Sequence, residues 1–201
     1  DHLTNGRVAW NIVTSYLPSA ARNLGFGDLP RHDDRYDRGD DYLEVLYKLW
    51  EASWEDDAVV RDLERGIYAE PAKVHPIDHE GPYYSVPGPH LCEPSPQRTP
   101  LLFQAGSSER GREFAARHAE CVFVLTGRPD EVAADIRSRA SRYGRHPEDI
   151  KICVAISLIV GGTEAEAQAK SDDLRQTLSL EGGLSHMSGH LGVDLSDIDP
   201  D

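Results

Sequence analysis

The stretch Leu101-Leu102-Phe103-Gln104-Ala105-Gly106-Ser107-Ser108-Glu109-Arg110-Gly111 decides the fold. Its first five residues carry no charge and predict a buried strand. Gly106 permits a turn, and Ser107 or Ser108 can cap a helix that continues to Ala119. The free N–H groups at such a helix start favour an anion, most often a phosphate. A helix cap with nothing bound is the alternative, because strand-to-helix turns are far commoner than phosphate sites.

The composition is that of an acidic globular protein. Of the 201 residues, 39% are hydrophobic and 28% are charged, and the net charge is −14. This charge argues against nucleic acid as a partner, yet it allows an anionic ligand held by backbone N–H groups and a few arginines. No apolar run approaches about 18 residues and no signal peptide is present, so we expect a cytoplasmic protein without a membrane partner. The chain opens without Met, and we expect it to be a piece of a longer protein.

Further apolar stretches predict strands at 7–15, 121–126 and 150–160. Helical patterns follow the strands, and Thr163 with Glu166 forms a capping box for the last of them. Strands that alternate with helices predict an α/β fold with a parallel sheet, either an open doubly wound sheet or a (β/α)8 barrel. No G-x-G-x-x-G follows a strand and no G-x4-G-K-[ST] occurs. The main sequence support for a Rossmann domain or a P-loop NTPase is therefore missing.

The charged run from Pro30 to Asp40 is expected to be a solvated loop, although Arg35 and Tyr36 could reach a phosphate from it. After it, a helical stripe of apolar residues predicts a helix that packs on the core. The members of this stripe are Leu43, Leu46, Tyr47, Trp50 and Trp54.

Residues 66–98 are rich in proline and lack apolar periodicity, which predicts an excursion with its own strands or a functional loop. This segment holds His75, His79, His90 and Cys92. Their spacing lacks the two tight ligand pairs of a zinc site, so we expect no metal. The tail from about 180 to 201 is expected to be a mobile loop, with His186 and His190 exposed. The cysteines Cys92, Cys121 and Cys153 are expected to be small buried apolar residues in a reducing compartment.

Three runs match one family in order and spacing. They are Gly6 to Ser15 (GRVAWNIVTS), His32 to Asp37 (HDDRYD) and Ser95 to Ser108 (SPQRTP through QAGSS). The chain resembles the nitrilotriacetate monooxygenase branch of the bacterial-luciferase-like flavin monooxygenases. That branch also includes dibenzothiophene-sulfone and long-chain alkane monooxygenases.

The resemblance covers essentially all 201 residues and implies a (β/α)8 barrel of the luciferase-like type. This chain would supply about strands four to seven, as a single partial domain over 1–201, with an insertion at about 66–98. The family's first strands, which carry an acidic residue and a Thr that contact the flavin, are absent. The flavin pocket of this chain alone is therefore expected to be incomplete.

The resemblance also implies a set of FMN-binding residues. His32, Tyr36 and Ser107 match residues that bind FMN in the family, and Ser108 lies next to the same phosphate site. Asn11 and Thr14 stand at a strand end that faces the flavin pocket. His32 is also the candidate catalytic residue, because it could hydrogen-bond the flavin or the peroxide.

The implied chemistry is that of an FMNH2-dependent two-component monooxygenase. Reduced FMN, supplied by a separate flavin reductase, reacts with O2 to a flavin hydroperoxide that oxygenates a small organic substrate, while the protein orients the flavin and excludes water. A homo-oligomer is expected. One alternative is a deazaflavin-dependent oxidoreductase of the same superfamily, and another is a truncated half-barrel without catalytic activity.

Overall fold

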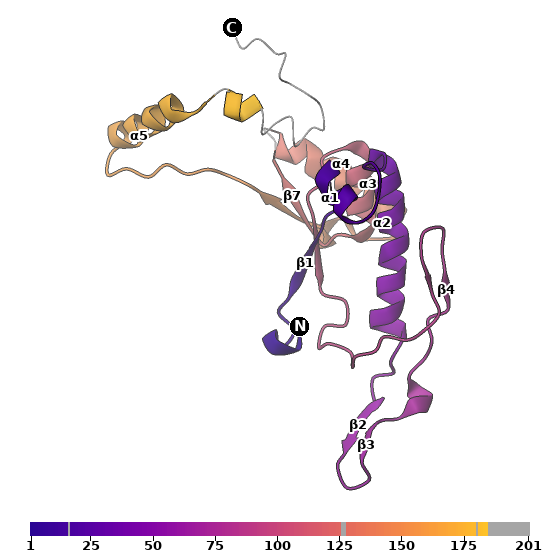
Figure 1. Ribbon diagram of the computed structural model, residues 1–201. Helices are drawn as coiled ribbons and strands as arrows, with labels where there is room; N and C mark the ends of the chain where they lie inside the picture. Colours follow the sequence, from indigo (N-terminus) through magenta and orange to yellow (C-terminus); the bar gives the residue numbers. More distant parts are fainter. Residues whose placement is uncertain (16, 126–127, 180, 185–201) are drawn as a thin grey trace. The chain divides into compact units, whose positions relative to one another are not determined.

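The computed structural model describes residues 1–15, 17–125, 128–179 and 181–184 (Figure 1). The chain forms two compact units. The first unit comprises Asp1–Thr14 and Arg31–Val154, and the second comprises Ser15–Pro30 and Ala155–Asp201. The expected loop at 180–201 was wrong over 181–184, which form one helical turn, and the rest of it, with His186 and His190, lies outside the described residues.

A four-stranded sheet organises the first unit. Its strands are β1 (Ala9–Ile12), β6 (Leu101–Gln104), β7 (Cys121–Val124) and β8 (Lys151–Val154). They lie in the order β1-β6-β7-β8, and every neighbouring pair is parallel. The predicted parallel sheet is confirmed. Because all four strands run in the same direction, their carboxyl ends meet at one edge of the sheet.

Helices cover one face of this sheet. They are α2 (His32–Tyr47), which a π-helix continues over Lys48–Ala52, α3 (Glu109–His118) and α4 (Pro129–Arg142). One core cluster lies between the sheet and α2 and α3, and its buried members are Ile12, Tyr36, Leu43, Leu102 and Phe114. A second cluster lies between the sheet, α3 and α4, and includes Ala115, Val122, Ile136 and Ile150. Leu102 belongs to the covered face of β6, whereas Leu101 on the opposite face is exposed.

The segment between α2 and β6 carries its own strands. This was one of the two alternatives expected for residues 66–98. A hairpin pairs β2 (Val59–Asp62) with β3 (Ile67–Ala69), and a second pairs β4 (His79–Glu80) with β5 (Ser85–Val86). In Figure 1 the β2–β3 hairpin extends beyond the carboxyl end of α2. Short 3-10 helices occur at His2–Thr4, Pro71–Lys73 and Pro147–Asp149. The expected burial of Cys92 was wrong, because this residue of the segment is exposed, whereas Cys121 on β7 is buried.

The expectation of a loop over the charged run from Pro30 was wrong, because α2 already begins at His32. The first turns of this helix lack an apolar stripe, so their periodicity is weak. They are held instead by the buried ring of Tyr36 and by ion pairs from Asp37 and Asp40 to Arg110 on α3. Paired charges thus replace the apolar face that a sequence pattern would show.

The strand expected over 150–160 was also too long, since β8 ends at Val154. Its last registered pair is Val154 with Val124, where β7 ends too. Beyond that point Ile156, Leu158 and Val160 are 73–78% exposed. An apolar run extends a strand only while a neighbour supplies backbone partners, and among the described residues that neighbour stops here.

The second unit contains α1 (Pro18–Asn23) and α5 (Glu164–Thr177). The predicted capping box of α5 is confirmed at its first half, because Thr163 Oγ1 accepts a hydrogen bond from the Glu166 amide at 3.2 Å. The Glu166 carboxylate accepts from the amide of Gly162 at 2.7 Å rather than from that of Thr163. Among the described residues, no helix is both long enough and apolar enough to cross a membrane.

Candidate functional site

The turn from β6 into α3 presents a set of hydrogen-bond donors at the carboxyl edge of the sheet. Ser108 is the N-cap of α3, and its Oγ accepts a hydrogen bond from the Gly111 amide at 3.0 Å. Ser107 is exposed, and its hydroxyl has no partner among the described residues. The amides of Glu109 and Arg110 begin the helix, where no preceding turn offers them an acceptor. The two serines therefore differ: Ser108 caps the helix, and Ser107 is available to a ligand.

Tyr36 brings a second hydroxyl to this turn from α2. The Tyr36 ring is 5% exposed, and its oxygen lies against Gly106 and Gly111. A Cβ on Gly106 would come within 2.4 Å of that oxygen, and one on Gly111 within 2.8 Å. Both glycines are therefore needed for the close approach of the hydroxyl to the turn. Because the resemblance matches both Tyr36 and Ser107 to FMN-binding residues, we also expect their two hydroxyls to approach each other, and this stays a prediction.

The side chain of Gln104 ties the two parts together. It is 3% exposed, and its Oε1 accepts a hydrogen bond from the Gly106 amide. Its Nε2 donates to the Tyr36 hydroxyl at 3.4 Å. A buried side-chain amide needs hydrogen-bond partners, and Gln104 finds them in the Gly106 amide and the Tyr36 hydroxyl.

The other expected FMN-binding residues lie around this turn at different depths. His32 is exposed, its ring centroid is 5.1 Å from that of Tyr36, and its Nδ1 hydrogen-bonds Asp33 at 2.6 Å. Thr14 follows β1, and its methyl carbon lies 3.7 Å from where a Cβ of Gly39 would stand. Asn11 is exposed on β1 and lies opposite Phe103, which is the residue before Gln104 on β6. The structure thus joins Tyr36 to the turn, with His32 as its neighbour on α2.

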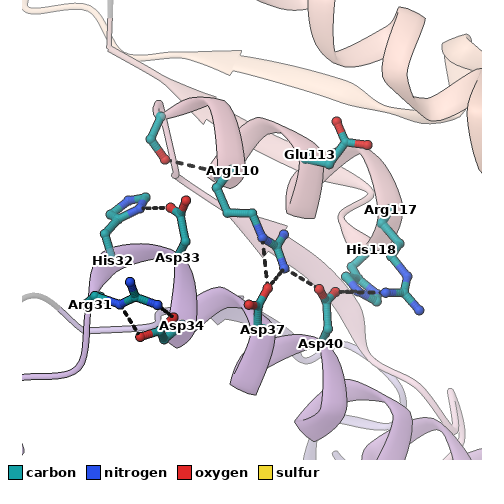
Figure 2. A network of polar contacts seen from close by, with 12 residues as sticks. Arg31, His32, Asp33, Asp34, Asp37, Asp40, Arg110, Glu113, Arg117 and His118 are labelled. Atoms are coloured by element: carbon teal, nitrogen blue, oxygen red, sulfur yellow. Dashed lines mark hydrogen bonds and ion pairs between the residues drawn. The ribbon is translucent and has the colours of Figure 1, made fainter.

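Arg110 links the start of α3 to α2, as Figure 2 shows. Its guanidinium pairs with Asp37 at 2.9 Å and with Asp40, and lies 5.6 Å from the centre of the Tyr36 ring. Two aspartates close to the turn are therefore paired with a cation, and Asp40 is paired with Arg117 as well. This pairing reduces the negative potential that an anion would meet there.

The same network continues to a buried histidine at the other end of α3. His118 Nε2 lies 2.6 Å from Asp40, and its Nδ1 lies 3.0 Å from the hydroxyl of Tyr47. Burial raises the pKa of Asp40, but hydrogen bonds from His118 and Arg110 outweigh it and hold that pKa below its ordinary value. Burial lowers the pKa of His118 and raises the pKa of Tyr47 to about 12.

These shifts predict that stability falls as the pH is lowered. The folded state holds the pKa of His118 below its ordinary 6.5, so protonation favours the unfolded chain as the pH drops through that value. The pKa of Asp40 is also depressed, so its contribution is lost at still lower pH, below its ordinary 3.8. Urea unfolding from pH 8 to pH 4 should show this decline. The decline between pH 7 and pH 5 should be shallower for His118→Gln, and an equal slope in both proteins would contradict the assignment.

The histidines of the 66–98 segment do not form a shared cluster among the described residues. One group there has ligand atoms within 4.8 Å of one another, and it consists of Asp41, Glu44 and His79. Both ring nitrogens of His79 are engaged, one by Asp41 at 2.8 Å and the other by the Lys48 ammonium at 3.1 Å. A cation beside the site disfavours a metal ion. Asp41 and His79 form a buried hydrogen-bonded pair that fastens β4 to α2, whereas Glu44 is exposed and pairs with Arg117.

Sequence reasoning missed three contributors to the site: Gln104, Arg110 and the pair of Asp40 with His118. Gln104 carried a usable signal, because it is the one polar residue of its strand and shares the covered face with Leu102. Arg110 and the pair carried no such signal, because Asp40 lies 70 residues from Arg110 and 78 residues from His118 in sequence.

The comparisons with known proteins point to one family. The family model described as "Luciferase-like monooxygenase" matches residues 1–193. The long-chain alkane monooxygenase of Geobacillus thermodenitrificans is 59% identical over 200 residues, which cover 98% of this chain and 45% of that protein. The dimethyl-sulfide monooxygenase of Hyphomicrobium sulfonivorans is 50% identical over 204 residues, which cover 100% of this chain and 42% of that protein.

Solved structures agree in fold. The crystal structure of a long-chain alkane monooxygenase superposes with a TM-score of 0.92 at 57% identity, over 98% of this chain and 46% of that one. A riboflavin lyase crystallised with modified FMN and riboflavin gives a TM-score of 0.91 at 44% identity, over 99% of this chain and 45% of that one.

The chain spans less than half the length of these curated relatives. Its four parallel strands are accordingly part of a luciferase-like (β/α)8 barrel, and the expected fold class is confirmed. With a family model over nearly all of its residues and relatives at 50% identity and above, this chain belongs to the luciferase-like monooxygenase family.

Proposed function

We propose that this chain is part of an FMN-dependent two-component monooxygenase, and that the FMN phosphate binds at the turn from β6 into α3. The observation that carries the proposal is the convergence of donors there. Tyr36 from α2 meets Gly106 at the turn. The next residue, Ser107, carries a hydroxyl without a partner in the described part of the chain and stands just before the first amides of α3. Hydroxyls and helix amides are the groups that bind phosphate without a positive side chain.

The residues present fit such a group in charge and in space. The carboxylates of Asp37 and Asp40 on α2 both pair with Arg110. Neither of them is therefore an unpaired negative charge in that network. Glycines at 106 and 111 let the Tyr36 hydroxyl pack against the turn, because a Cβ at either position would come within 2.8 Å of the Tyr36 oxygen. A phenolic donor is thus held beside the free amides of the helix start.

The other expected residues take distinct roles in the proposal. Ser107 and Tyr36 donate hydrogen bonds to the phosphate, and Ser108 orients the helix start through its cap. His32, beside Tyr36, and Asn11 and Thr14, on and after β1, face the flavin itself. Reduced flavin supplies the electrons that activate O2, and the protein positions it and keeps water away. His32 remains the candidate for a hydrogen bond to the reacting part of the flavin.

The partners follow from this chemistry. A separate flavin reductase delivers reduced FMN, and O2 and a small organic substrate meet at the flavin. A homo-oligomer is part of the proposal as well. The relatives named above act on an alkane and on dimethyl sulfide, so the substrate class varies within the family.

The test uses the full-length protein that carries this sequence. It is mixed with a flavin reductase, NADH and FMN, and oxygen uptake is followed against a panel of alkanes, sulfides, sulfones and aminocarboxylates. Substrate-dependent oxygen uptake with an oxygenated product supports the proposal. A protein that binds FMN tightly but never forms an oxygenated product, or that accepts only a deazaflavin, contradicts it.

A further inference from the structure

The geometry points to Gln104 as a positioning residue that sets the direction of the Tyr36 hydroxyl proton. This inference rests on the proposed phosphate site at the β6–α3 turn and adds a residue outside the set matched to FMN. Its basis is the two hydrogen bonds of the Gln104 side chain, which is 3% exposed.

The orientation of the Gln104 amide is fixed by the backbone. The N–H of Gly106 can only donate, so the Gln104 atom that faces it has to be the carbonyl oxygen Oε1. The NH2 group is then left on the other side, where it faces the Tyr36 oxygen at 3.4 Å. An amide that could otherwise be placed either way round has a single satisfactory arrangement here.

This arrangement decides what the tyrosine can do. A phenol has one proton and can accept as well as donate. Because Gln104 donates to the Tyr36 oxygen, the phenol acts as the acceptor in that contact and keeps its own proton. No other described residue accepts that proton, and the ring is 5% exposed with its oxygen against Gly106 and Gly111. Since the Tyr36 oxygen lies at the turn and its proton has no acceptor among the described residues, an anion bound at the turn would be that acceptor.

Two substitutions separate this role from a structural one. Gln104→Met keeps a similar volume but cannot donate to Tyr36. Gln104→Glu keeps an acceptor for the Gly106 amide, while its carboxylate accepts the Tyr36 proton and turns it away from the turn. Each is made in the wild-type background and together with Tyr36→Phe, in the full-length protein. FMN and riboflavin affinities are measured for each by fluorescence titration, beside a melting curve.

We expect Gln104→Met to weaken FMN binding about tenfold when Tyr36 is present and by about twofold or less with Tyr36→Phe. Riboflavin, which lacks the phosphate, should bind all these proteins about equally. Gln104→Glu should weaken FMN more at pH 8 than at pH 5.5, relative to wild type, because a protonated carboxyl can donate to Tyr36 again. If Gln104→Met fails to fold, the inference is tested by Gln104→Glu alone, compared with and without Tyr36→Phe.

The results distinguish two failures. An equal loss of FMN affinity with and without Tyr36, or no loss at all in a folded variant, overturns the positioning role of Gln104. If Tyr36→Phe itself leaves the preference for FMN over riboflavin unchanged, Tyr36 does not contact the phosphate, and the proposed contact fails as well. A loss of that preference with Tyr36→Phe but without coupling to Gln104 overturns this inference and leaves the proposed function standing.

Discussion

Phe114→Ala is expected to lower the free energy of unfolding by about 3–5 kcal/mol. The Phe114 ring is fully buried on α3 and packs at ring-centroid distances of 5.4 Å from Tyr36 and 4.8 Å from His118. It also lies 3.2 Å from where a Cβ of Gly39 would stand, so α2 approaches it closely. Truncation leaves a cavity that the helices cannot close, since Asp40 on α2 is held by an ion pair with Arg110 and by a hydrogen bond with His118 on α3.

Urea unfolding measures this loss, with Leu63→Ala as the matched control. Leu63 is 94% exposed, so its truncation should change stability by no more than about 0.5 kcal/mol. A loss below about 1.5 kcal/mol for Phe114→Ala would contradict the account of the α2–α3 core. Because Phe114 contacts Tyr36, the variant should also weaken FMN binding while it is still folded.

Asp41→Ala is expected to cost about 3–5 kcal/mol of stability, because it leaves buried partners without their anion. The Asp41 carboxylate is 4% exposed, pairs with His79 at 2.8 Å and accepts the amides of Tyr83 and Tyr84 at 2.8 and 2.9 Å. Burial raises the pKa of Asp41, but these hydrogen bonds outweigh it and hold that pKa below its ordinary value.

The control is Asp56→Ala, which removes a carboxylate that is 97% exposed and pairs with Arg98 at 2.6 Å. An exposed ion pair is worth about 0–1 kcal/mol, so the two aspartates should differ by several-fold in cost. Asp41→Asn should fall between them, since the amide oxygen can still accept a backbone bond. Equal costs for Asp41→Ala and Asp56→Ala in urea unfolding would show that the β4 network adds nothing to stability.

Local patterns predicted the sheet well because the strands of a parallel sheet read as apolar runs, although the described helices of the first unit cover only one face of the sheet in this chain. The β6 strand and the Ser108 cap lie in one continuous stretch, so strand, turn and cap could be predicted from neighbouring residues. The cap of Thr163 on α5 was predictable for the same reason. Features that depend only on residues close together in sequence can be predicted without knowledge of the fold.

Features that depend on distant partners were not predictable. The beginning of α2 is stabilised by Arg110, more than 70 residues further along the chain, and the end of β8 is set by the end of β7. The link between Gln104 and Tyr36 joins residues 68 positions apart. The candidate site itself could be named from the family resemblance, but the way its donors are held required the packing of α2 against the turn.

The most direct test of the central claim is the preference for FMN over riboflavin in Ser107→Ala. The two flavins differ by the phosphate, so the ratio of their dissociation constants isolates its contacts. Loss of a hydrogen bond to a charged group, about 1.5–3 kcal/mol, should reduce the preference by about ten- to a hundredfold. Ser141→Ala, at the far end of α4, should leave it unchanged. A full preference for FMN in folded Ser107→Ala would contradict the claim that the phosphate binds at this turn.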